Sequence, residues 1–209
     1  MKDIHFHIST FSNFQISKSH MTQDNVLDLF RQSGALLEGH FRLSSGLHSD
    51  RYLQSALVLQ HPDFAEQMGR ALAARLEHLQ PTVILSPALG GIVIGQEVGR
   101  AMHIRAQFAE RQEGKLTLRR GFTLSPSDRV VVVEDVITTG GSTRETIVVA
   151  EEAGASVMGV AAIIDRGADP GRLNLPLQAL VRMEVPAYSA ESCPMCAKGL
   201  PVTKPGSRA

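Results

Sequence analysis

The sequence predicts an α/β fold, a central parallel sheet with flanking helices, preceded by a small region of irregular strands. Strand-like and helix-like segments alternate between about residues 82 and 165, which is typical of βα units. Residues 130–133 are four valines, as expected of a strand buried on both faces of a parallel sheet. The 209 residues, 43% hydrophobic and 20% charged, suit one domain with a substantial core.

The charge balance excludes the simplest arguments for a polyanionic partner. Lysine plus arginine equal aspartate plus glutamate at 21 each, so we expect neither a nucleic-acid nor a membrane partner. No apolar run approaches the length that spans a bilayer. Two cysteines cannot form a disulfide framework and nothing else indicates secretion, so we expect a cytoplasmic protein.

Residues 1–20 differ from the rest of the chain. They are rich in serine and histidine, show no helical period, and are followed at once by Met21. We expect a disordered extension or an upstream translation start. His5, His7 and His20 are interpreted as ordinary residues of a polar tail rather than metal ligands.

Two helices and a turn-rich region precede the first βα unit. Residues 24–32 have an amphipathic pattern and end near Gly34, which favours a short helix. Residues 35–59 are rich in turn formers, with strand fragments expected only at 41–43 and 52–53. Residues 63–79 again carry apolar side chains at helical spacing.

The βα units follow in a regular order. We expect strands at 82–86, 104–108, 129–134 and 157–164, helices at 92–102 and 142–153, and polar or glycine-rich strand ends at 87–91, 110–120, 134–142 and 165–166. The carboxyl ends of parallel strands share one edge of a sheet, where α/β proteins bind ligands. The four strand ends can therefore converge on one active site.

The most informative segment is 130–143, VVVVEDVITTGGST. Glu134 and Asp135 fall at the carboxyl end of a buried strand, where carboxylates can hold ribose hydroxyls or a metal. The loop after them supplies hydroxyls and backbone amides at a helix N-terminus, as a phosphate requires. Its residues are Thr138, Thr139, Gly140, Gly141 and Ser142. The segment predicts a ribose-phosphate ligand.

A purely structural explanation covers only part of this segment. Ser142 and Glu145 have the spacing of a capping box, which would account for both without a ligand. Capping does not explain two carboxylates directly after a buried strand. The loop also lacks the lysine of the GxxxxGK[ST] phosphate loop and the spacing of GxGxxG.

Two further strand ends suit phosphate chemistry. Residues 87–91, PALGG, would alone be a tight turn, but beside the first loop they are interpreted as a second phosphate site. Residues 110–121 carry four cations and a central glycine, Gly114. Such a loop is often only a solvated surface, yet it also suits a mobile lid that neutralises a leaving phosphate group. The cations are Arg111, Lys115, Arg119 and Arg120.

Arg166 ends the last predicted strand of the core. An arginine there can form a bidentate pair with a planar acidic ligand. The alternative is an ion pair with Asp165 or Asp169.

Cys193 and Cys196 have metal-ligand spacing, but a zinc site takes four ligands and the chain has no second CxxC. Zinc shared between two subunits and a redox pair both remain open. We favour a plain turn, followed by a basic surface tail over residues 198–208.

Residues 130–143 resemble the phosphoribosyl-pyrophosphate (PRPP) signature of the type I phosphoribosyltransferase family. Residues 39–49, GHFRLSSGLHS, are similar to the FxLxSGxxS segment of its orotate branch, and residues 110–122 and 193–208 look like one bacterial part of that branch. The resemblance covers about residues 26–208. It implies a domain over 21–209, with a hood from about 21–60 and the C-terminal segment, and a core of about 63–170.

The resemblance implies a reaction and its partners. Orotate and PRPP would give orotidine 5′-monophosphate and pyrophosphate with Mg²⁺ as cofactor, in pyrimidine synthesis. A homodimer with shared active sites is implied, because the lid of this family reaches into the neighbouring subunit. No side chain is expected as a metal ligand.

The resemblance also implies residue roles. Glu134 and Asp135 would hold the ribose hydroxyls, Thr138 the orotate carboxylate, and Arg166 the pyrimidine ring. The catalytic residues would be Lys115, Arg111 and Asp135. The residues implied for PRPP are Leu89, Gly90, Gly91, Arg111, Lys115, Glu134, Asp135, Val136, Ile137, Thr138, Thr139, Gly140, Gly141 and Ser142.

Four positions depart from the pattern of many relatives. Basic residues or histidine would be expected where this chain has Ser44, Gly90, Gln112 and Thr117. Because these basic groups are missing, Arg111 and Lys115 are expected to supply most of the positive charge at the site, with Arg119 or Arg120 as further candidates. Two alternatives stay open, a transferase for a purine base and a non-catalytic regulator that binds nucleotides or RNA. Neutral net charge disfavours RNA, and Lys115 in the lid favours catalysis.

Overall fold

A computed structural model of the chain describes residues 21–43, 45–167 and 173–205. The expectations for residues 1–20, Ser44, Asp169 and the end of the basic tail lie outside the described residues. Within that part, no helix is both long and apolar enough to cross a membrane.

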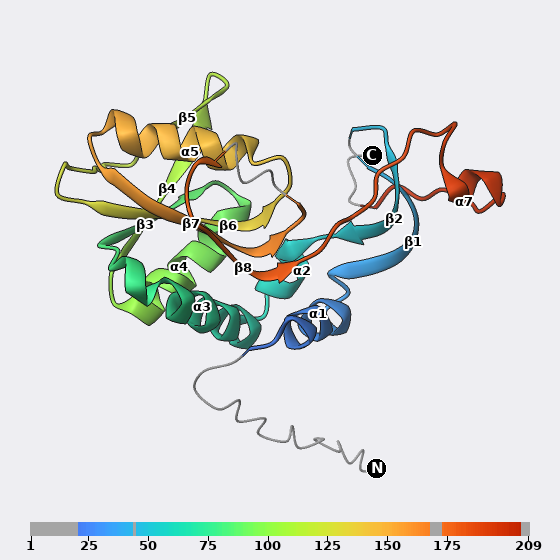
Figure 1. The fold of residues 1–209 in the computed structure, drawn as a ribbon, viewed down its shortest axis with the longest axis horizontal. Coiled ribbons are helices and arrows are strands. Elements are labelled where there is room, and N and C mark those ends of the chain that lie inside the picture. The colour runs from blue at the N-terminus through green and yellow to red at the C-terminus, as the bar shows by residue number, and fades with distance from the viewer. Residues whose placement is uncertain (1–20, 44, 168–172, 206–209) are drawn as a thin grey trace, which may run out of the picture.

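A six-stranded sheet in the order β5-β4-β3-β6-β7-β8 forms the centre of the molecule (Figure 1). Its strands are β3 Val83–Pro87, β4 Arg105–Gln112, β5 Lys115–Leu118, β6 Arg129–Ile137, β7 Ser156–Asp165 and β8 Leu177–Arg182. All neighbours are parallel except β4 and β5. The predicted α/β fold with a parallel sheet is confirmed.

Apolar strands allow this sheet to bury both of its faces. The four valines of β6 are completely buried, and they divide between two hydrophobic clusters on opposite faces of the sheet. The helices α3 Pro62–Leu76 and α4 Gly90–Met102 cover one face, and α5 Gly141–Glu152 covers the other (Figure 1).

Glycines bring α4 close to the sheet. Gly91, Gly95 and Gly99 recur at four-residue spacing along α4, so they form one stripe. A Cβ atom at Gly95 would lie 2.1 Å from Ser86 Oγ, and one at Gly91 would lie 2.9 Å from the Val133 carbonyl oxygen. The stripe fixes the beginning of α4 against β3 and β6.

The hood contains more regular structure than predicted. The helix α1 Gln23–Gln32 is followed by an antiparallel pair, β1 Leu36–Arg42 and β2 His48–Leu53, and by the short helix α2 Ser55–Leu59. The C-terminal segment crosses this hairpin (Figure 1). It carries the four-residue helix α7 Pro194–Ala197 where a plain turn was expected at the cysteines.

Residues 110–120 are not the open loop that was predicted. Most of them form the hairpin of β4 and β5, in which Gln112 pairs with Lys115. The two residues between them, Glu113 and Gly114, have φ values of 51° and 85°. Two positive φ values are what a type I′ hairpin turn needs. The segment expected to be a mobile charged loop is therefore a hairpin with a tight turn.

Candidate active site

The site lies where β3, β6 and β7 end. Gly90 and Gly91, predicted as loop residues, are the first residues of α4, which begins two residues earlier than expected. β6 continues three residues past its predicted end, so Asp135 as well as Glu134 is a strand residue. Their side chains point to opposite faces because a strand has a period of two.

Glu134 is buried against α5. It is only 5% exposed, and its Oε1 accepts hydrogen bonds from Ser142 Oγ at 2.9 Å and Thr143 Oγ1 at 3.0 Å. Burial raises the pKa of Glu134 to about 7, helped by repulsion from Asp135, while the two hydroxyls oppose the shift.

These contacts correct the capping-box alternative. α5 begins after Gly140, whose φ is 77°, and no side chain caps its N-terminus. Ser142 donates to Glu134 instead. The other residue of the supposed box, Glu145, forms an ion pair with Arg111. The first turn of α5 therefore keeps free backbone N–H groups for an anion.

Asp135 faces α4 and the hood. Its Oδ2 accepts a hydrogen bond from Ser55 Oγ, and a Cβ atom at Gly90 would lie 2.6 Å from Asp135 Oδ1. α4 can approach this carboxylate so closely only because residue 90 is a glycine and has no Cβ atom. The basic residue expected at this position has no room for its Cβ in this arrangement.

Strand register brings Thr138 and Arg166 together. Ile137 pairs with Asp165, and the Arg166 backbone N–H donates to the Ile137 carbonyl at 2.9 Å. Thr138 and Arg166, the next residues after these paired positions of β6 and β7, are therefore neighbours at the shared edge. Val136 is half-buried and Ile137 is buried, so contact between Ile137 and a ligand would involve its backbone.

Arg166 does not form the ion pair with Asp165 that was one alternative, and the other partner, Asp169, lies outside the described residues. Asp165 accepts from Arg182 Nε at 2.9 Å instead. Arg166 is half-buried, and its Nε atom is buried with no hydrogen-bond partner in the described part of the chain. Burial lowers the pKa of this guanidinium. A buried donor without a partner is the feature that an anionic ligand would complete.

The predicted lid cations come from β4, β5 and the residues that follow β5. Arg111 is tied to α5, with its Nη1 2.9 Å from Glu145 Oε2 and 2.7 Å from the Gly114 carbonyl. Both ionic side chains are about half exposed, so the pair is weak and exchangeable. Arg119 and Arg120 pair with Glu110 at 3.7 Å and 2.7 Å. Lys115 is exposed at the start of β5.

The sequence reasoning missed two contributors. Thr143 is the last residue of the PRPP-like segment, and that position is its signal in the sequence; its Oγ1 donates to buried Glu134. Ser55 stands 80 residues before its partner Asp135. No local pattern marks it, because only the folding of α2 against the sheet brings the two together.

Comparison with known proteins identifies the family. The family described as the phosphoribosyl transferase domain matches residues 55–176. Orotate phosphoribosyltransferase of Pelotomaculum thermopropionicum is 50% identical over 188 residues, covering 90% of this chain and 99% of that protein. That of Heliobacterium modesticaldum is 53% identical over 190 residues, covering 90% and 100%. The chain belongs to the orotate phosphoribosyltransferase family.

A solved structure supports the fold of this phosphoribosyltransferase. Mycobacterium tuberculosis orotate phosphoribosyltransferase in complex with PRPP has a TM-score of 0.61 at 21% identity, over 77% of this chain and 96% of that one. At this identity the likeness concerns the fold alone.

Proposed function

We propose that this protein transfers the 5-phosphoribosyl group of PRPP to orotate, giving orotidine 5′-monophosphate and pyrophosphate in pyrimidine synthesis. The observation that carries the choice of base is Arg166, whose Nε is buried without a partner in the described residues and whose neighbour is Thr138. Orotate offers a planar anionic edge that a guanidinium can pair with. A neutral purine offers no carboxylate.

Charge development in the reaction explains the other groups. Loss of pyrophosphate builds positive charge at the ribose anomeric carbon, and the Glu134 and Asp135 carboxylates stabilise it. The N-terminal turn of α5, with Thr139 and Ser142, binds the 5′-phosphate. Leu89, Gly90 and Gly91 at the start of α4 contact pyrophosphate, and Lys115 and Arg111 neutralise it as it leaves. A ring nitrogen of orotate is the nucleophile, so the protein supplies none.

The residues present fit a Mg²⁺ ion that arrives with PRPP. Mg²⁺ is usually bound by one or two carboxylates together with substrate phosphates, and half-buried Asp135 lies beside the proposed pyrophosphate site. Asp135 is the residue that would hold it, directly or through water. The ion would neutralise charge on the phosphates.

We further propose a homodimer in which Lys115 serves the partner's site. Two strands separate β5 from β6 in the sheet, so three strand spacings put about 14 Å between them. That distance favours action of Lys115 on a neighbouring subunit. Leu89, 83% exposed, and Val93, 43% exposed, offer apolar surface for the contact. We also propose that the chain forms a single domain with a hood and that it acts in the cytoplasm.

The activity test uses the whole chain with PRPP and Mg²⁺. We expect loss of orotate absorbance and formation of orotidine 5′-monophosphate, with no turnover of adenine, guanine or uracil. Turnover of a purine would favour the purine transferase. Binding of nucleotides by folded protein without turnover of any base would favour the regulator.

The close approach at Gly90 gives a first mutational prediction. Gly90→Ala forces the Asp135 carboxylate away from its place and from Ser55. We expect the KM for PRPP to rise about 10-fold, equivalent to about 1.4 kcal/mol, with the KM for orotate little changed. Ser55→Ala removes the same hydrogen bond without crowding and should have a smaller effect in the same direction. An unchanged KM for PRPP in Gly90→Ala would contradict the assignment of Asp135.

A further inference from the structure

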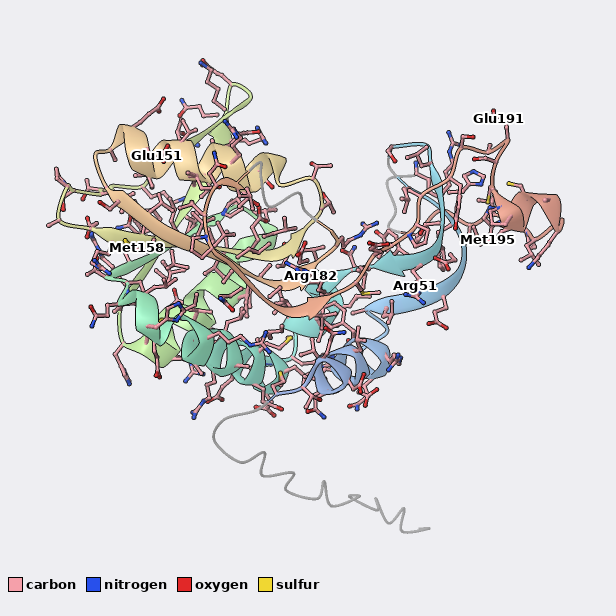
Figure 2. The ribbon with its side chains drawn as sticks, in the orientation of Figure 1. Arg51, Glu151, Met158, Arg182, Glu191 and Met195 are labelled. Atoms are coloured by element: carbon pink, nitrogen blue, oxygen red, sulfur yellow. The ribbon has the colours of Figure 1, made fainter. Side chains whose placement is uncertain are left out.

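Four side chains with metal-binding atoms meet outside the proposed active site. They are His40, His48, Cys193 and Cys196, whose ligating atoms all lie within 4.8 Å of one another. The histidines lie on β1 and β2, and the cysteines on the C-terminal segment about 150 residues later. Figure 2 shows this segment, marked by Glu191 and Met195, at the end of the molecule opposite Glu151 of α5.

The distances suit tetrahedral zinc. Zinc bonds of about 2.3 Å to sulfur and 2.0–2.1 Å to nitrogen give tetrahedral edges of about 3.6 Å between sulfur and nitrogen and about 3.3 Å between nitrogens. Cys193 Sγ and Cys196 Sγ both lie 3.6 Å from His40 Nε2, and Cys196 Sγ lies 3.2 Å from His48 Nδ1. The two histidine nitrogens are 2.8 Å apart, so they need to move apart only by about 0.5 Å to bind the same zinc ion.

A second contact orients one histidine for a metal. His40 Nδ1 lies 2.9 Å from the Leu200 carbonyl oxygen. A carbonyl only accepts, so Nδ1 carries the proton and Nε2 keeps its lone pair toward the cluster. Histidine ligands of metals are usually fixed by such a contact through the other ring nitrogen.

The surrounding structure has little else to hold it together. The two hydrophobic clusters of the described residues contain nothing from 37–52 or 184–205. Backbone pairs join the hairpin to the C-terminal segment on either side of the cysteines, between His48 and Tyr188 and between Phe41 and Thr203. A cross-link between these two pairs would stabilise a region with almost no apolar core.

We infer that His40, His48, Cys193 and Cys196 bind one structural Zn²⁺ ion per chain, which clamps the C-terminal segment onto the β1–β2 hairpin. Two sulfur and two nitrogen donors favour Zn²⁺ over Mg²⁺ or Ca²⁺, which prefer oxygen. Four protein ligands complete the tetrahedron and leave no open position, so the ion has a structural role. The histidines supply the second ligand pair that the sequence lacked as a second CxxC.

The test measures metal on the whole chain, purified under reducing conditions with zinc and without a polyhistidine tag. We expect one Zn²⁺ per chain by mass spectrometry of the elements. Because the chain has only two cysteines, a thiol reagent should find both protected until a chelator is added. Co²⁺ in place of Zn²⁺ should give the intense visible bands of a tetrahedral site with thiolate charge transfer. These measurements need no variant to fold.

Matched variants locate the ion. Cys196→Ser and His40→Gln should weaken Zn²⁺ binding more than about 100-fold, because even outer-shell changes cost about 10- to 100-fold. His78→Gln, an exposed histidine elsewhere, should bind as wild type does. Chelation should speed proteolysis within 184–205 by about 10-fold or more, since the clamped segment would open locally. Zinc-free wild type, reactive thiols in the presence of Zn²⁺, an octahedral Co²⁺ spectrum or a Cys193–Cys196 disulfide would each overturn the proposal.

Discussion

Replacing Lys115 with alanine should lower kcat by about 10²- to 10³-fold, the usual effect of removing one group that stabilises charge in a transition state. PRPP binding should change by less than about 3-fold, because the α5 N-terminus and Asp135 remain. Lys115 is exposed at the start of β5 and acts, in the proposed mechanism, only as charge develops on pyrophosphate. Initial rates and direct titration with PRPP measure the two effects.

Two variants serve as controls for Lys115. Lys204→Ala removes an exposed lysine from the C-terminal segment and should retain full activity. Arg120→Ala removes a cation of the same hairpin that already pairs with Glu110 at 2.7 Å, so its effect should be much smaller than that of Lys115→Ala. Equal losses in Arg120→Ala and Lys115→Ala would mean that the hairpin acts through its fold or its total charge.

Mixed dimers test whether Lys115 serves the partner. A dimer of one Lys115→Ala chain and one Asp135→Asn chain has one intact site if the hairpin crosses between subunits, and none if it does not. With equal amounts and free exchange, half of the dimers are mixed, so about a quarter of wild-type activity should return. Confirmed mixed dimers without activity would assign Lys115 to the site of its own chain.

Local sequence predicted the parts of this molecule that depend on local patterns. The valines of β6 and the alternation of strands and helices predicted the sheet, and Glu134 and Asp135 were expected at its carboxyl edge. Element boundaries were less exact. β6 continues to Ile137, because a strand goes on for as long as its neighbour pairs with it, and Ile137 pairs with Asp165. No property of Val136 or Ile137 alone distinguishes strand from loop there.

Contacts distant in sequence were not predictable in the same way. Ser55 reaches Asp135 across 80 residues, and His40 reaches Cys193 across 153. The spacing of Cys193 and Cys196 alone indicates only half of a zinc site, because a local pattern can show only ligands that lie near one another in the chain. Here the hairpin and the C-terminal segment are brought together by backbone pairing at Tyr188 and Thr203, a tertiary fact with no local signature.

Glu134→Gln should stabilise the protein above pH 7 while lowering its activity. Burial and the neighbouring Asp135 raise the pKa of Glu134 to about 7, from an ordinary value of 4.5. Between these two pH values the folded chain keeps a proton that the unfolded chain has lost, so the free energy of unfolding falls as pH rises. The total loss is about 3 kcal/mol, complete just above pH 7. Glutamine stays neutral and can still accept from Ser142 and Thr143, so it avoids that loss.

Urea unfolding at pH 5, 6, 7 and 8 measures this effect. The quantity compared is the difference in the free energy of unfolding between wild type and variant, because the titration of the histidines cancels in that difference. The two free energies of unfolding should be similar near pH 5. At pH 8 that of Glu134→Gln should be higher by up to about 3 kcal/mol. Glu145→Gln is the control, since that carboxylate is 44% exposed on α5, the helix that packs against Glu134, and should not reproduce the pH dependence. Parallel stability curves for wild type and Glu134→Gln would show that Glu134 ionises normally.

The same ionisation should control catalysis in the opposite direction. In the proposed mechanism only the carboxylate form of Glu134 stabilises positive charge on the ribose, so kcat/KM for PRPP should rise with pH through about 7 and then level off. Glu134→Gln should lose this rise as well as most of its activity. The rise in pH that ionises Glu134 is thus expected to lower the stability of the free protein and to raise its activity. In the proposed mechanism, the phosphoribosyltransferase bears the stability cost of a buried carboxylate because the charge of Glu134 is needed only when the cationic sugar forms.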